Sequence, residues 1–274
     1  MSAAVAAAAG AARRLGVPVR DPAVLRESSS VIVLLAPGGP VARVAGLTAA
    51  VRDNRAHRTR EVDVARALAA AGAPVVAPFE PAGPHEQDGR LVTLWELAPG
   101  GPEPDGVAIG TALRACHVAL RGYRRALPPL GSLLDEAIAV LERGVLEPAD
   151  AELVRDGLAA VSAEIDAFHA PVQPLHGDAS LGNALPGPLW NDWEDACIGP
   201  VEWDLACLVT SARVTGERRA VAEAALAAYG AALPELFVRA RGFQVVAWSG
   251  FAAAAGDARA RLRARLAWLR SQLG

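Results

Sequence analysis

The sequence predicts an α+β chain with a small, sheet-rich N-terminal part and a larger, mostly helical C-terminal part. Three observations support this fold class. Short strand-like runs separated by turn residues fill the first third of the 274 residues, the Pro- and Gly-rich stretch Ala98–Gly106 follows, and helical spacing dominates after it. A chain of this length is long enough for one large domain or for two lobes.

A hairpin is expected early in the chain. "VIVLLA" (31–36) and "VARVA" (41–45) flank "PGGP", which is a turn signal. The Ala-rich N-terminus carries its arginines after the apolar run, the reverse of a secretion signal, and therefore predicts a helix. The remaining elements expected in this part are a helix over 60–72, ended by Gly72, and strands over 73–79 and 90–97.

Composition excludes several classes of protein. Hydrophobic residues make up 52% of the chain, which is enough for a sizeable core, and the net charge of −3 does not suggest a nucleic-acid partner. No uncharged run reaches the ~18 apolar residues that a membrane span needs. The cysteines are odd in number and form no CxxC pair, so we expect free thiols in a reducing cytoplasm: Cys116, Cys197 and Cys207.

The helical part is interrupted by "QPLHGDASLGNAL", residues 173–185, which brings His176, Asp178 and Asn183 together. Protein kinases use H-R-D-x-x-x-x-N, with the same spacing, in their catalytic loop. There the Asp accepts the proton of the attacking hydroxyl and the Asn binds a metal ion. Asp192 follows an apolar pair, at the place where the D-F-G Asp of kinases holds Mg²⁺ against the phosphates. The alternative is a chance placement of polar residues in a turn.

The segment HGD-x4-N, followed by "DWED" and "GPVEWDLA", resembles the aminoglycoside phosphotransferase family, kinase-like enzymes that phosphorylate hydroxyl groups of small molecules. Gly177 stands where protein kinases have Arg, as in that family. The resemblance runs from about Glu27 to Leu208. It implies a bilobal protein-kinase-like fold. Residues 1–97 would form a nucleotide-binding lobe with an antiparallel sheet, and residues 98–274 a helical lobe that carries catalysis and substrate binding.

The resemblance also implies a set of nucleotide-binding residues. These are Ser28, Ser29 and Ser30 in a loop over the phosphates, Arg43 as the phosphate-binding residue, Glu61 as its partner, and Trp95, Glu96 and Leu97 as the hinge beside the adenine. Alternatives stay open for the serines, for Arg43 and for Glu61. The serines would otherwise lead into an ordinary hairpin, Arg43 would lie on the surface at a strand end, and Glu61 would be a solvated acid in the first turn of its helix.

Two features depart from the family pattern. All 27 basic residues are arginines, and Arg43 replaces the usual Lys; its planar guanidinium binds phosphate well but with different geometry. Asn183 and Asp192 are only nine residues apart, so the hairpin between them is expected to be trimmed to a short turn with Pro186–Pro188 at its tip.

The function implied is ATP-dependent O-phosphorylation of a small-molecule alcohol, with GTP as the alternative donor. Asp178 would take the hydroxyl proton, His176 would shape the loop, and Asn183 and Asp192 would hold Mg²⁺. An aminoglycoside or another antibiotic is the first acceptor class, which would imply antibiotic resistance. Choline-like amines, amino-acid alcohols and sugars are the others. The rival hypothesis is a non-catalytic nucleotide-binding or scaffold protein, because the Lys is absent.

Several residues near these motifs have two readings. Glu194 and Asp195 would bind metal or a cationic substrate, or they would be solvated or cap a helix. The arginines of "RARLRARLAWLR" (259–270) are expected on a solvated face. Trp248 would line the acceptor pocket or pack in the core. By resemblance, Asp204 would brace the catalytic loop from the following helix.

Overall fold

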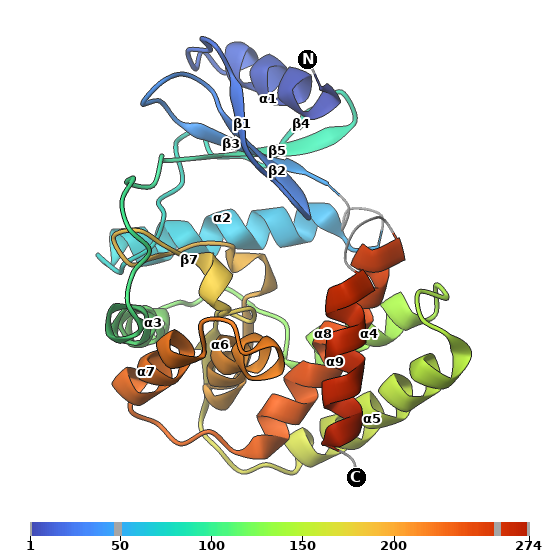
Figure 1. Cartoon of the computed structure of the whole chain (residues 1–274). Helices are drawn as coiled ribbons and strands as arrows, with labels where there is room; N and C mark the ends of the chain where they lie inside the picture. The colour runs from blue at the N-terminus through green and yellow to red at the C-terminus, as the bar shows by residue number, and fades with distance from the viewer. Residues whose placement is uncertain (1, 47–50, 255–258, 273–274) are drawn as a thin grey trace.

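The computed structural model describes residues 2–46, 51–254 and 259–272. A small sheet-bearing part lies above a larger helical part (Figure 1). The sheet is antiparallel and five-stranded, in the order β1-β2-β3-β5-β4. Its strands are β1 (Ala23–Glu27), β2 (Ser30–Leu34), β3 (Val41–Ala45), β4 (His85–Gln87) and β5 (Arg90–Trp95). This is the α+β, kinase-like arrangement that the sequence predicts.

The alanine-rich N-terminus forms the predicted helix, α1 (Ala3–Arg14), on the outer face of this sheet (Figure 1). Ser2 caps it by accepting a hydrogen bond from the N–H of Val5 at 3.3 Å. The small side chains of Ala8 and Ala12 are fully buried against the sheet. Hydrophobic burial therefore holds α1 and the strands together as one core.

The predicted hairpin of β2 and β3 is confirmed, and so is the strand at β5. The strand expected over 73–79 is wrong. Val75 and Pro78 make only isolated bridges, and Pro74 and Pro78 lack the N–H groups that a ladder needs. The sequence analysis did not predict β1 and β4.

The helix α2 (Asn54–Ala70) begins before the residue that the pattern predicts. Asp53 caps it by accepting a hydrogen bond from the N–H of Ala56 at 3.1 Å, and Gly72 follows its end in the left-handed region, as expected. The helix crosses beneath the sheet (Figure 1). Its buried face, which includes Val62 and Leu68, belongs to the core of the helical part.

The larger part is built from seven helices among the described residues: α3 (Gly106–Leu120), α4 (Gly131–Leu141), α5 (Pro148–Asp166), α6 (Glu202–Thr215), α7 (Arg219–Tyr229), α8 (Glu235–Ala254) and α9 (Arg259–Ser271). The stretch between β5 and α3 is irregular, as its Pro and Gly content predicts. The boundary between residues 97 and 98 falls in it and stays a prediction.

An extended insertion between α5 and α6 carries the catalytic motifs. It contains the paired strands β6 (Val172–Leu175) and β9 (Cys197–Pro200), the hairpin β7 (Ala184–Leu185) and β8 (Leu189–Trp190), and two single turns, η2 (Leu181–Asn183) and η3 (Trp193–Asp195). The trimmed hairpin is confirmed, because Leu185 pairs with Leu189 and Gly187 turns with φ 85°.

Two further expectations can be compared with the structure. All three cysteines are buried and free. In the ranges that the structure describes, every helix is too short or too polar to cross a membrane.

The close packing of α3 on α7 depends on Gly110. A Cβ at this position would lie 2.0 Å from the backbone oxygen of Ala225. We expect Gly110→Ala to lower the free energy of unfolding by about 1–3 kcal/mol, because the two helices must separate. Urea unfolding measures the difference. The control is Gly131→Ala, where a Cβ meets no atom within 4 Å. Equal stability of both variants would contradict this packing.

Candidate active site

A single carboxylate holds the catalytic loop from beneath. Asp204, on α6, accepts hydrogen bonds from the backbone N–H groups of His176 at 2.7 Å and Gly177 at 2.9 Å. Its Oδ2 also lies 2.8 Å from Nε2 of His117, whose Nδ1 lies 2.7 Å from the Tyr229 hydroxyl. Asp204 is fully buried, so the loop conformation is tied to the helical core.

Gly177 is required by space and by backbone conformation. Its φ is 85°, and a Cβ would lie 1.9 Å from the backbone oxygen of Asp195. Its carbonyl accepts a hydrogen bond from Nε1 of Trp203 at 2.8 Å. Protein kinases have an Arg at this place, but an Arg here would not fit unless the backbone at Asp195 moved.

His176 lies under the loop rather than in the cleft above it. Its ring lies beside Trp190 and Trp193, with centroids 5.4 and 4.3 Å away. The N–H of Asp178 donates to Nδ1 at 3.3 Å, so Nε2 carries the proton that is shared with the Asn191 carbonyl at 2.9 Å. The side chain joins the two halves of the insertion.

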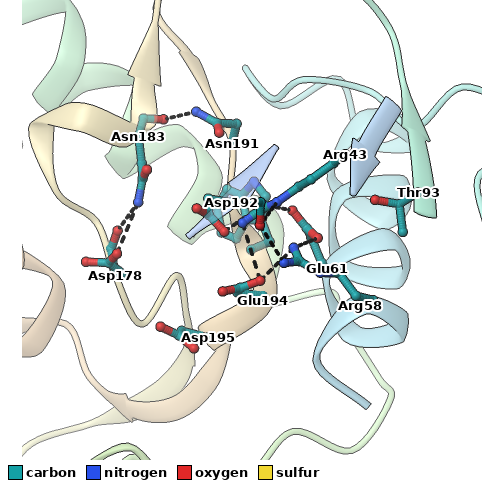
Figure 2. A network of polar contacts seen from close by, with 12 residues as sticks. Arg43, Arg58, Glu61, Thr93, Asp178, Asn183, Asn191, Asp192, Glu194 and Asp195 are labelled. Carbon is teal, nitrogen blue, oxygen red and sulfur yellow. Dashed lines mark hydrogen bonds and ion pairs between the residues drawn. The ribbon is translucent and has the colours of Figure 1, made fainter. Parts of the chain in front are cut away.

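Asp178 and Asn183 are in direct contact (Figure 2). The Asn183 amide donates to the Asp178 carbonyl at 2.9 Å and to its Oδ2 at 3.3 Å. On the other side, Arg241 of α8 contacts Oδ1. Burial raises the pKa of Asp178, while the Arg241 charge opposes the rise. Sequence analysis missed Arg241, because no motif surrounds it and only the fold brings α8 to this loop.

Arg43 lies in a buried charge cluster where the sheet meets the helical part (Figure 2). Its guanidinium pairs with Glu61 and lies 2.7 Å from Asp192 and 3.3 Å from Glu194. Nε donates to the Ser30 hydroxyl at 3.2 Å. Burial acts to lower the pKa of Arg43, but the three carboxylates outweigh burial and raise it.

A second arginine, which the sequence analysis also missed, completes this cluster. Arg58 lies 2.9 Å from Glu61 and 2.6 Å from Glu194, and it donates to Ser30 at 2.8 Å. It is three residues before Glu61 on α2, so both side chains lie on one helix face. Glu61 is 1% exposed, which rules out the solvated alternative, and Glu194 is likewise a buried ion-pair partner.

A cleft of about 460 Å³ lies between the sheet and the catalytic loop. It is lined by every predicted site residue except His176: Ser28, Ser29, Ser30, Arg43, Glu61, Trp95, Glu96, Leu97, Asp178, Asn183 and Asp192. Trp95 is buried and its indole donates to Thr93 at 2.8 Å. The structure thus brings residues from five separate segments to one cavity, and their individual roles stay predictions.

The donor set around Asp192 suits a hard divalent cation. Asp192 adopts the left-handed conformation with φ 68°, and its Oδ1 lies 2.7 Å from Nη1 of Arg43, which leaves Oδ2 as the carboxylate oxygen for a metal. Asn183 uses its amide nitrogen toward Asp178, which leaves its amide oxygen as the atom for a metal. Two such oxygen donors are what Mg²⁺ takes from protein when phosphates and water complete its shell.

One other group of metal-type side chains lies nearby. His57, Glu136 and Asp195 have ligand atoms within 4.8 Å of one another. The Arg52 guanidinium lies 2.9 Å from both Glu136 and Asp195, so this group already surrounds a cation. We therefore do not count it as a metal site.

The fold and this cleft define a kinase-like phosphotransferase. Residues 40–243 match the phosphotransferase enzyme family, and the chain therefore belongs to that family. Its members are small-molecule kinases that phosphorylate hydroxyl groups, so the predicted class of enzyme is confirmed. No curated protein matches the chain.

Solved structures of kinases share the fold at low sequence identity. A choline/ethanolamine kinase family protein from Mesorhizobium loti is 20% identical, with 92% of this chain and 87% of that chain covered and a TM-score of 0.63. The choline kinase LicA from Streptococcus pneumoniae is 14% identical, with coverages of 95% and 98% and a TM-score of 0.67. The aminoglycoside phosphotransferase APH(4)-Ia, a thermostable mutant with ADP and hygromycin B, is 16% identical, with coverages of 97% and 98% and a TM-score of 0.60.

The loop brace generates a prediction. Asp204→Asn would replace one acceptor oxygen by an amide that faces backbone N–H donors. We expect it to lower the free energy of unfolding by about 3 kcal/mol and to reduce turnover, because buried donors lose their partner. Urea unfolding and ADP release measure the two effects. The exposed Asp156→Asn serves as the control and is expected to behave as wild type.

The difference in stability between wild type and Asp204→Asn is expected to depend on pH. Burial acts to raise the pKa of Asp204, but His117 and the backbone N–H of His176 lower it overall. A carboxylate whose pKa is lowered in the folded state stabilises the fold at pH values above its unfolded pKa of about 3.9. This contribution is lost as the pH falls from that value through the folded pKa. The stability advantage of wild type over Asp204→Asn should therefore shrink below about pH 4. A constant difference would contradict the brace.

Proposed function

We propose that this protein transfers the γ-phosphoryl group of ATP to a hydroxyl of a small molecule, with Asp178 as the base. One observation carries the proposal. The nucleotide-sized cleft and a second pocket against α8 share Asp178 and Asp192 in their linings, so an acceptor and a nucleotide would meet at these carboxylates. The ADP complex of the APH(4)-Ia relative supports an adenine nucleotide as donor.

The chain's residues would divide the work as follows. Arg43, held by Glu61, would neutralise the α- and β-phosphates, and the serine loop before β2 would offer N–H and hydroxyl donors to the nucleotide. Asn183 and Asp192 would hold Mg²⁺, which when bound neutralises charge on the phosphates. Most of the catalytic effect would come from positioning and charge neutralisation.

The proposed reaction balances in one step. The bond between the γ-phosphorus and the ADP oxygen breaks, and a bond from the acceptor oxygen to that phosphorus forms. Asp178 orients the acceptor hydroxyl and receives its proton. Arg241 engages one carboxylate oxygen of Asp178 and Asn183 approaches the other, so the carboxylate is fixed in orientation before an acceptor arrives.

The acceptor remains the open part of this proposal. An aminoglycoside or another antibiotic, with a role in resistance, and choline-like amines are candidate classes, because aminoglycoside and choline kinases share the fold. We propose a cytoplasmic location, where ATP is abundant and free cysteines persist. A screen for ADP release over aminoglycosides, macrolides and amino alcohols would identify the class. A wild-type protein that binds no nucleotide at millimolar concentration with Mg²⁺ would favour the scaffold hypothesis instead.

Asp178→Asn tests the base. The substitution keeps the shape of the side chain but removes its capacity to take a proton. Turnover should fall by about 10²- to 10⁴-fold while nucleotide affinity stays within about threefold. ADP release and calorimetric titration with a non-hydrolysable ATP analogue measure both quantities. The exposed Asp135→Asn is the control. Near-normal turnover of Asp178→Asn would reject the assignment.

Arg43 tests the nucleotide lobe. Arg43→Ala leaves Glu61 and Asp192 without their shared cation, and it should raise the KM for ATP and lower kcat, together by about tenfold or more in kcat/KM. Arg43→Lys should retain much of the activity, because an ammonium still supplies the charge. Steady-state kinetics at varied ATP concentration measure KM and kcat for each variant. Arg20→Ala, at an exposed position, is the control. Unchanged KM and kcat in Arg43→Ala would show that Arg43 and Glu61 do not bind the nucleotide phosphates.

A further inference from the structure

The second pocket, of about 320 Å³, has an unusual charge balance. It lies between the catalytic loop and the helices α8 and α9, and Trp248 forms part of its wall. Arg52 packs over the Trp248 ring, with its guanidinium carbon 4.5 Å from the ring centroid. The expected place of Trp248 in an acceptor pocket thus agrees with the geometry, and the pocket has both an aromatic and a charged wall.

Carboxylates line this pocket, and a cationic acceptor would need one of them to be free. Each of the four is already paired with an arginine: Asp178 with Arg241, Asp192 with Arg43, Asp195 with Arg52, and Glu194 with Arg43, Arg52 and Arg58. In the described part of the chain, the pocket therefore offers no unpaired negative charge to an ammonium group.

The charge without a counter-ion is positive. Arg265, on α9, lines the pocket and donates from Nη1 to the Ser249 hydroxyl. Its buried Nε has no hydrogen-bond partner, and none of the described carboxylates lies within 4.0 Å of its guanidinium. Burial, together with the charges of Arg241 and Arg261, lowers the pKa of Arg265 to about 10, and the more distant charge of Asp178 opposes this only in part. An anion in the pocket would relieve this unfavourable burial of a cation.

This arrangement differs from the sequence expectation. The arginines of residues 259–270 were expected on a solvated face, and Arg263 and Arg270 are exposed. Arg265 is the one among the described residues of α9 that lines the acceptor pocket. Arg241 lies in the same lining, so two guanidinium groups from adjacent helices approach one cavity next to Asp178.

We propose that the acceptor carries an anionic group, a carboxylate or a phosphate ester, that binds Arg265 while its hydroxyl faces Asp178. Guanidinium groups bind both kinds of oxyanion through paired hydrogen bonds. This inference rests on the proposed function and narrows it: hydroxy acids or phosphorylated alcohols would be preferred over polycationic aminoglycosides and choline-like amines.

Matched pairs of small probes test the preference. L-serine and ethanolamine differ by a carboxylate, and glycerol phosphate and glycerol differ by a phosphate. Calorimetric titration into wild-type protein loaded with Mg²⁺ and a non-hydrolysable ATP analogue should give at least about tenfold tighter binding for L-serine than for ethanolamine, or for glycerol phosphate than for glycerol. L-serine and glycerol phosphate are the oxyanion probes. Which pair responds distinguishes carboxylate from phosphate recognition.

Variants connect that preference to Arg265. Arg265→Gln should weaken binding of the preferred oxyanion probe by about tenfold or more and leave the affinity for the ATP analogue unchanged. The matched control is Arg263→Gln, on the same helix but exposed and outside the pocket, which should bind every probe as wild type does. Thermal melting of each variant checks that it is folded.

Two results would overturn the inference while the proposed function stands. One is equal or tighter binding of ethanolamine, glycerol, choline or kanamycin than of both oxyanion probes. The other is an affinity for the oxyanion probes that Arg265→Gln leaves unchanged. Failure of the proposed function looks different, since the wild-type protein would then bind no ATP analogue and would release no ADP with any acceptor.

Discussion

The buried ion-pair cluster around Arg43 is the interaction on which the rest of the active site depends. It joins β3, α2 and the segment of Asp192 and Glu194, which are far apart in the chain. Arg43 and Arg58 share Glu61 and Glu194 on one side, and Asp192 completes the group. Because charges buried this deeply are costly unless each has a partner, the cluster constrains the sheet, the helix and the loop to one relative placement.

The cluster also gives a physical account of the Arg in place of Lys. A Lys has a single ammonium, whereas the Arg43 fork reaches three carboxylates and the Ser30 hydroxyl at once. The additional acid, Glu194, and the second arginine, Arg58, belong to the same network. The site therefore contains a larger set of matched charges around this position, and the substitution is compatible with a working nucleotide lobe.

Below the cluster, close packing and hydrogen bonds hold the HGD-x4-N loop in place. Asp204 holds its backbone, Gly177 allows the loop to approach Asp195, and His176 links it to Asn191. Arg241 then reaches Asp178 from α8. Both carboxylate oxygens of Asp178 thus have partners before ligands bind, an arrangement that would suit preorganised electrostatic catalysis. The two cavities on either side of Asp178 follow from this geometry.

The fold class, the family and eleven of the residues that line the cleft between the sheet and the HGD-x4-N loop could be predicted from the sequence. Local signals suffice for these, because HGD-x4-N with Asp192 and "WDLA" has a spacing that few other structures need, and the hairpin, α1 and the trimmed turn are encoded by short-range patterns. The strand expected over 73–79 failed for a local reason as well, since its prolines cannot take part in a ladder.

Only the tertiary structure decided which charges meet. Arg58, Arg241 and Arg265 lie in ordinary helical sequence, and a helical arginine is equally compatible with solvent, an ion pair or a pocket. Arg58 reaches Glu194, and Arg241 reaches Asp178, across long stretches of chain, and Arg265 enters the pocket lining only because α9 packs there, so the packing of α2, α8 and α9 against the loop sets their roles. For this reason the reaction class could be predicted from the sequence, whereas the charges that line the pocket beside α8 and α9 became visible only in the folded molecule.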